Sequence, residues 1–151
     1  MATRLTIYTD GAARGNPGPS ASGFIAIDSN GKQIAKEWVY NGAGTNNNAE
    51  YGAVILALEW CAKSFHDAKE LEIDLFSDSE LIVRQLNSEY KTKSKAMVEK
   101  KAAALLLAKK FKSVRFCNVP RENAGIAAVD RHLNMMLDKM GAAPGAAKGG
   151  G

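Results

Sequence analysis

Three acidic residues stand where rigid backbone could hold their side chains as metal ligands or catalytic groups. Asp10 follows the alternating run 5–9 and precedes a turn rich in glycine, asparagine and proline, so we expect it at the end of a strand. Asp78 likewise follows the alternating run 71–76. Glu50 opens a helical pattern and projects within about 40° of its apolar stripe. Three inward carboxylates can bind Mg²⁺ or Mn²⁺, hard cations that prefer oxygen ligands.

Each of these residues also has an ordinary structural explanation. Asp10 before a glycine suits a turn, and Asp78 suits a helix N-cap. Glu50 in a first helical turn is stabilised by the helix dipole by about 0.3–1 kcal/mol. The metal-site interpretation therefore requires a fold that brings the three side chains together.

The predicted elements supply such a fold. Two strands are predicted at residues 21–28 and 33–40, joined by a hairpin turn at Asn30-Gly31. Together with the strand at 5–9, they should form an antiparallel meander. A helix is predicted from Ala49 to about Ser64, and the strand at 71–76 follows it. This crossover allows the later strand to pair parallel with the first, which places Asp78 beside Asp10. Further elements are predicted as follows: helices at 80–86, 97–111 and 127–140, and a strand at 114–119.

Composition sets the outer limits. With 151 residues, of which 46% are hydrophobic, the chain suits one domain, at residues 1–140, followed by a Gly/Ala-rich tail at 141–151 that we expect to be disordered. No apolar run is as long as a membrane span and no signal peptide is evident, so we expect a cytoplasmic monomer without membrane contact. Cys61 and Cys117 lack the spacing of a zinc site. The net charge of +4 permits a polyanionic partner.

Four motifs, taken in order, resemble those of type 1 ribonuclease H. They are TDGAARGNPGP, TNNNAEYGAVILALE, FSDSELIVRQLNSEYK and VPREN with VDRHLN, and they span roughly residues 4–138. The resemblance implies the α/β ribonuclease H-like fold, a five-stranded mixed sheet of three antiparallel then two parallel strands, with helices on both faces. It also implies an endonuclease that hydrolyses the RNA strand of RNA/DNA hybrids and leaves 5′-phosphate and 3′-hydroxyl ends.

In that family four carboxylates bind two divalent cations, Mg²⁺ or Mn²⁺. The matching positions are Asp10, Glu50, Asp78 and Asp130, which we predict in the first turn of the last helix. Two cations about 3.5–4 Å apart activate the attacking water and neutralise the leaving 3′-oxygen. Asp10 resembles the ligand shared by both ions.

The resemblance also implies residues that hold the substrate. Asn16, Asn46 and Asn47, with the exposed backbone of Gly11, match positions near the scissile site, where amides can bond 2′-hydroxyl groups. Thr45 matches a position that grips a DNA phosphate in some members. The alternative is that these are ordinary turn and cap residues. We expect phosphate contacts from two lysines in the polar connection at 87–96, Lys91 and Lys93.

Three features depart from the family pattern. The short connection at 87–96 stands where many members have a basic protrusion, which indicates a short form. The loop before Asp130 has no histidine, so Glu122 is the candidate for an assisting role, and three extra residues separate Asn123 from Asp130. Two other functions stay open: a non-catalytic hybrid or double-stranded RNA binding module, and a DNA-cleaving relative such as a junction resolvase. Four acidic positions disfavour the first, and the asparagines disfavour the second.

Overall fold

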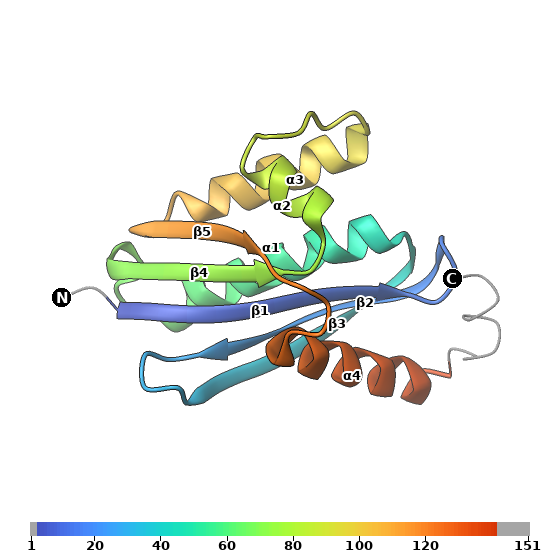
Figure 1. Cartoon of the computed structure of the whole chain (residues 1–151), viewed down its shortest axis with the longest axis horizontal. Coiled ribbons are helices and arrows are strands. Elements are labelled where there is room, and N and C mark those ends of the chain that lie inside the picture. Colours follow the sequence, from blue (N-terminus) through green and yellow to red (C-terminus); the bar gives the residue numbers. More distant parts are fainter. Residues whose placement is uncertain (1–2, 142–151) are drawn as a thin grey trace.

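Five strands form one mixed sheet in the order β3-β2-β1-β4-β5. We describe residues 3–141 from a computed structural model (Figure 1). The strands are β1 (Thr3–Ala13), β2 (Gly18–Ile27), β3 (Gln33–Gly44), β4 (Leu71–Ser77) and β5 (Ser113–Asn118). The first three pair antiparallel, whereas β4 runs parallel to β1 and β5 runs parallel to β4. The predicted meander and the parallel crossover are thus confirmed.

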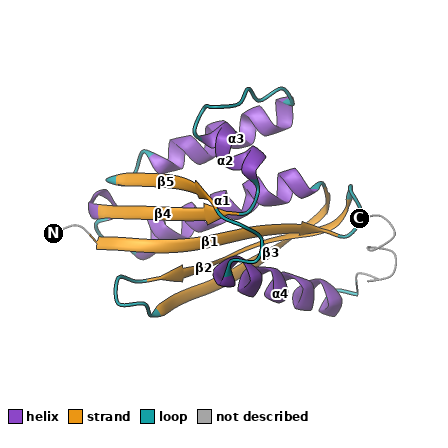
Figure 2. Ribbon diagram, viewed as in Figure 1, coloured by secondary structure: helices purple, strands orange, loops and turns teal. Residues whose placement is uncertain are grey.

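Helices cover both faces of this sheet (Figure 2). They are α1 (Asn46–Ser64), the short 3₁₀ helix η1 (Ala68–Glu70), α2 (Glu80–Leu86), α3 (Lys95–Ala108) and α4 (Ala124–Lys139). The larger core lies on one face, where Leu5 and Ile7 of β1 pack with Val54 and Leu58 of α1. A smaller core lies on the opposite face, under α4. None of the helices within residues 3–141 has the length and apolar character needed to cross a bilayer.

β1 extends beyond the point where the sequence predicts its end. Its pairing with β4 stops at Tyr8 and Phe76, but its pairing with β2 continues to Ala13 and Ser20. Asp10 therefore lies inside a strand, so the prediction that the strand ends there is wrong. The reason is that β2 still supplies hydrogen bonds after β4 has turned away. Because side chains alternate along a strand, Asp10 shares the α4 face with Tyr8.

Two helices begin three residues earlier than predicted. Thr45 caps α1, and its Oγ1 accepts from the Asn48 backbone N–H at 3.1 Å. Asn123 caps α4 through Oδ1, which accepts from the N–H groups of Gly125 at 2.9 Å and Ile126 at 3.2 Å. The three extra residues of the last loop thus form an additional helical turn. Asp130 lies in the second turn of α4, so its predicted first-turn position is wrong.

The predicted tail lies almost wholly outside the described residues, because residues 142–151 are not described. The division at residue 140 therefore stays a prediction. Within the described part, α4 ends at Lys139, with Met140 as its C-cap.

Candidate active site

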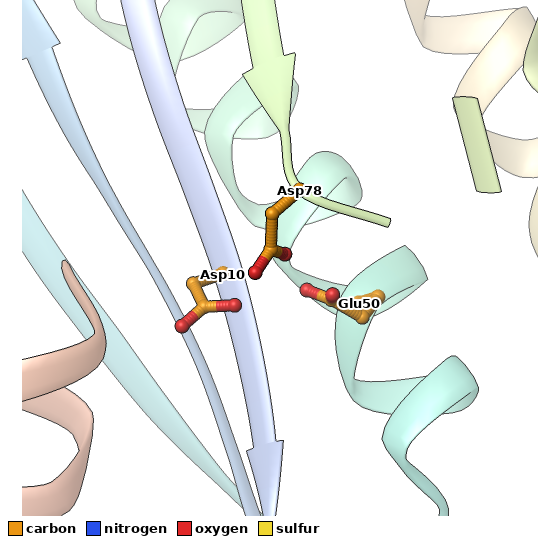
Figure 3. A group of neighbouring side chains, drawn as sticks. All are labelled: Asp10, Glu50 and Asp78. Atoms are coloured by element: carbon orange, nitrogen blue, oxygen red, sulfur yellow. The ribbon is translucent and has the colours of Figure 1, made fainter. Parts of the chain in front are cut away.

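Three carboxylates from separate elements meet beside β1. Asp10 lies on β1, Glu50 on α1 and Asp78 just after β4, and one ligand atom from each lies within 4.8 Å of the other two. Figure 3 shows the three side chains directed toward one another. Asp10 is only 5% exposed. The structure therefore brings together the three residues that the sequence predicts as a cation site.

Gly11 allows Glu50 to reach this cluster. A Cβ atom at Gly11 would lie 2.3 Å from the backbone carbon of Ala49, so only glycine lets the first turn of α1 approach β1 this closely. The Gly11 N–H donates to Glu50 Oε1 at 2.6 Å. This bond satisfies a backbone donor of β1 beyond the end of its pairing with β4. The sequence predicts that the exposed backbone of Gly11 contacts the substrate, and in the structure its N–H holds Glu50.

Asp130 lies at the same site but outside the group of three. It lines an open cleft of about 450 Å³ together with Asp10, Glu50 and Asp78. Its negative charge helps to raise the pKa of Asp10, so the two carboxyl groups lie close enough to interact. Gly125 lets α4 lie close to β1, because a Cβ atom there would lie 2.4 Å from the Tyr8 ring. The fourth predicted acidic residue thus lines the same cleft as the other three.

Burial and mutual repulsion raise the pKa values of the cluster. Burial, followed by the negative charges of Asp78 and Asp130, raises the pKa of Asp10 to about 8. The pKa of Glu50 lies well above its ordinary value, first through burial and then through the charges of Asp10 and Asp78. Full ionisation is therefore unfavourable without a counter-charge. Oxygen donors at this spacing, short of positive charge, fit a hard divalent cation.

Two of the three predicted asparagines, Asn16 and Asn46, make structural hydrogen bonds. The Oδ1 of Asn46 accepts from the Ala13 N–H at 3.1 Å, and the Oδ1 of Asn16 accepts from the Asn46 N–H at 3.0 Å. These bonds tie the β1–β2 turn to the start of α1. Asn46 also lines the cleft. Thr45 is the N-cap of α1, and its hydroxyl accepts the capping hydrogen bond, as the ordinary structural explanation predicts.

Other predicted residues lie outside the cleft lining. Lys91 and Lys93 are exposed in the connection between α2 and α3 (Figure 1) and do not line the cleft. Glu122 is exposed too, but its neighbour Arg121 lines the cleft. Asn134, which also lines the cleft one helical turn after Asp130, was not predicted from the sequence. Its i,i+4 spacing from Asp130 is the signal that could have identified it.

The sequence is similar to known ribonucleases H. It is 37% identical over 118 residues to ribonuclease HI of Halobacterium salinarum, covering 78% of this chain and 57% of that protein. It is 32% identical over 139 residues to the bifunctional protein Rv2228c of Mycobacterium tuberculosis, covering 89% of this chain and 36% of that protein. The chain thus spans only about half, or less, of the length of these relatives.

Solved structures of RNase H1 proteins are similar to this chain in both fold and sequence. RNase H1 from Halobacterium salinarum has a TM-score of 0.82 and 35% identity, covering 90% of this chain and 98% of that chain. LC11-RNase H1, isolated from compost and solved in complex with an RNA/DNA hybrid, has a TM-score of 0.83 and 38% identity, with the same coverage of each chain. A model of the RNase H family matches residues 2–136. The predicted resemblance is confirmed, and the chain belongs to the type 1 RNase H family.

Proposed function

We propose that this chain is an endonuclease that hydrolyses the RNA strand of RNA/DNA hybrids, leaving 5′-phosphate and 3′-hydroxyl ends. The observation that carries the proposal is the convergence of Asp10, Glu50 and Asp78 within 4.8 Å in an open cleft. The similarity to LC11-RNase H1, whose structure holds an RNA/DNA hybrid, supports the substrate.

The ligands of two Mg²⁺ or Mn²⁺ ions are Asp10, Glu50, Asp78 and Asp130 in this proposal. When bound, two such ions lower the pKa of the attacking water and neutralise charge on the leaving 3′-oxygen. Asp10 is the natural shared ligand, because its charge interacts with both Asp78 and Asp130. Glu50 is held in place by the Gly11 N–H, so its carboxylate is oriented before any ion binds.

Polar residues in and beside the cleft act on the substrate in this proposal. Arg121 supplies a permanent positive charge beside the carboxylates, which suits a phosphate of the RNA strand. Asn16 and Asn46 are exposed, and their amide NH₂ groups can bond the 2′-hydroxyl groups that distinguish RNA from DNA. Asn47 is proposed for the same role from the family pattern. Contacts of this kind read the sugar and backbone, so cleavage should show little sequence preference.

The two alternative functions, a non-catalytic binding module and a DNA-cleaving enzyme, require different residues at the site. A binding module would gain nothing from a buried acidic cluster, because the carboxylates repel the phosphates of any nucleic acid. A DNA-cleaving enzyme would share the acidic cluster but would not need exposed amides beside it. The convergence of Asp10, Glu50 and Asp78 in the cleft therefore disfavours the first alternative most strongly.

One assay separates these functions. Labelled RNA/DNA hybrid, duplex RNA and duplex DNA are each incubated with the protein in Mg²⁺ or Mn²⁺, with EDTA as the metal-free control. We expect cleavage of the RNA strand in the hybrid alone, and none in EDTA. Binding without cleavage in either metal, or equal cleavage of duplex DNA, would contradict the proposal. Asp10→Asn should abolish cleavage but keep the circular dichroism spectrum and hybrid binding.

A further inference from the structure

A buried arginine connects the β1–β2 turn to the helix that bears Asp130. The guanidinium of Arg14 donates through Nη2 to the Asn134 backbone oxygen at 3.1 Å and to Asn134 Oδ1 at 3.2 Å. Its Nη1 forms an ion pair with Asp138 Oδ1 at 2.5 Å. The Arg14 side chain is only 10% exposed, whereas that of Asp138 is 55% exposed. Arg14 therefore contacts two successive turns of α4, one facing the cleft and one facing solvent.

The carboxamide of Asn134 continues this chain of bonds to the acidic site. Its Nδ2 donates to the Asp130 backbone oxygen at 3.0 Å and to Asp130 Oδ1 at 3.3 Å. A carboxamide has one accepting end and one donating end. Because Arg14 is a donor only, it must face Oδ1, which leaves Nδ2 directed at Asp130. The arginine thus fixes which end of the amide meets the carboxylate.

The orientation of the Asp130 carboxylate depends on such a hydrogen bond. The other three acidic residues lie on β1, just after β4 or on α1, and Glu50 is fixed by a backbone N–H. Asp130 belongs to α4, which packs on β1 and β2 through the smaller core. Its charge interacts with that of Asp10, and when both carboxylates are ionised their repulsion favours rotation of the Asp130 side chain away from the cleft. A donor on Asp130 Oδ1 opposes that rotation and leaves the second oxygen available.

We propose that Arg14 and Asn134 are positioning residues for Asp130: the guanidinium orients the carboxamide, and the carboxamide holds the Asp130 carboxylate toward Asp10. This inference rests on the proposed function, in which Asp130 is a metal ligand. Partners of this kind, which hydrogen-bond a metal ligand without touching the metal, change metal affinity or activity by about 10- to 100-fold when removed.

Three substitutions test the inference. Asn134→Ala removes the carboxamide, and Asn134→Asp keeps an acceptor for Arg14 but loses the donor to Asp130. Asp138→Asn is the matched control, because it removes the charge of the exposed partner of the same guanidinium and leaves the Asn134 bonds in place. Hybrid cleavage, thermal unfolding and calorimetric titration with Mn²⁺ are measured for each variant and for the wild type.

We expect both Asn134 variants to lower kcat by about 10-fold or more, with KM for the hybrid within about twofold of the wild type. Asn134→Ala should also weaken Mn²⁺ binding by about 10-fold. Asp138→Asn should leave kcat and Mn²⁺ binding unchanged. Adding Arg14→Leu to Asn134→Ala should lower kcat no further, because the arginine acts through the amide.

The outcomes separate this inference from the proposed function. If the wild type does not cleave the hybrid, the proposed function fails, and the Mn²⁺ titration still tests the positioning role. If the wild type cleaves and the Asn134 variants match it in kcat and Mn²⁺ affinity, the positioning role is wrong. A loss of kcat that is equal in Asp138→Asn, or that only follows a lower unfolding temperature, would also overturn it.

Discussion

At the scale of single residues, the protonation of Asp10 controls how the metal-free protein responds to pH. Burial and the charges of Asp78 and Asp130 raise its pKa from 3.8 to about 8. Between these two values the folded protein holds a proton that the unfolded chain has lost. The free energy of unfolding therefore falls as the pH rises through this range, and the loss is complete above about pH 8.

Asp10→Asn should consequently stabilise the metal-free protein at pH 8. The amide is neutral at every pH, so the substitution removes the repulsion without removing the side-chain volume. We expect a rise of several degrees in the unfolding temperature at pH 8, since 1 kcal/mol corresponds to about 2–4 °C in a domain of this size. The difference should nearly vanish at pH 4. Thermal melts in EDTA followed by circular dichroism measure both; an unfolding temperature at pH 8 no higher than that of the wild type would refute the argument.

The same raised pKa links metal binding to proton release. Asp10 is largely protonated at pH 6.5. Its carboxylate can therefore bind a cation only after this proton has been released. Mn²⁺ affinity should therefore increase from pH 6.5 to pH 8.5 and change little above that. Calorimetric titrations in two buffers of different ionisation enthalpy would count the protons released. Affinity that does not change with pH, with no proton released at pH 6.5, would show that Asp10 is already ionised.

At the scale of elements, two glycines set how closely helices approach β1. A Cβ atom on Gly11 would meet the backbone of α1, which cannot move without carrying Glu50 with it. A Cβ atom on Gly125 would meet the ring of Tyr8, which is a side chain and carries no residue of the acidic cluster with it. Helix propensity, moreover, favours alanine over glycine within α4 by about 1 kcal/mol. The two positions therefore differ in what a single methyl group should cost.

We expect Gly11→Ala to be much more damaging than Gly125→Ala. Gly11→Ala should lower the unfolding temperature by about 5 °C or more and reduce hybrid cleavage by at least about 10-fold, because Glu50 is displaced. Gly125→Ala, the matched control, should cost less in both measurements. Similar losses in the two variants would mean that α1 can adjust its position on β1 as readily as the Tyr8 ring moves.

The elements also show where sequence reasoning stops. Alternation and helical spacing located Asp10, Glu50 and Asp78 because those patterns are local. The extension of β1 past Asp10 was not predictable in this way, because it depends on continued pairing with β2. Likewise, the Arg14–Asn134 bond joins residues 120 positions apart and exists only because α4 crosses the β1–β2 turn. Contacts set by topology leave no periodic signal in the sequence.

At the scale of the whole molecule, the charge is distributed unevenly with respect to the cleft. The net charge is +4, although the cleft itself collects four carboxylates. Positive charge must therefore lie elsewhere, and several lysines are exposed around α2 and α3. Asp78 follows the end of β4, α2 begins at Glu80, and the connection to α3 follows the end of α2 (Figure 1). Lys109 and Lys110 lie near the opposite end of β4, because the following Lys112 donates to the carbonyl of Leu71 at the start of β4.

This arrangement predicts different roles for two pairs of exposed lysines. A hybrid that enters the cleft and continues along the molecule would reach Lys91 and Lys93, so replacing both with alanine should raise KM several-fold and leave kcat unchanged. Each lost phosphate contact should also make the slope of log affinity against log salt shallower by about 1. Lys109→Ala with Lys110→Ala removes the same charge and is the control for net charge. Binding titrations between 50 and 200 mM KCl would compare the pairs; equal effects would show that overall charge, not local contact, binds the hybrid.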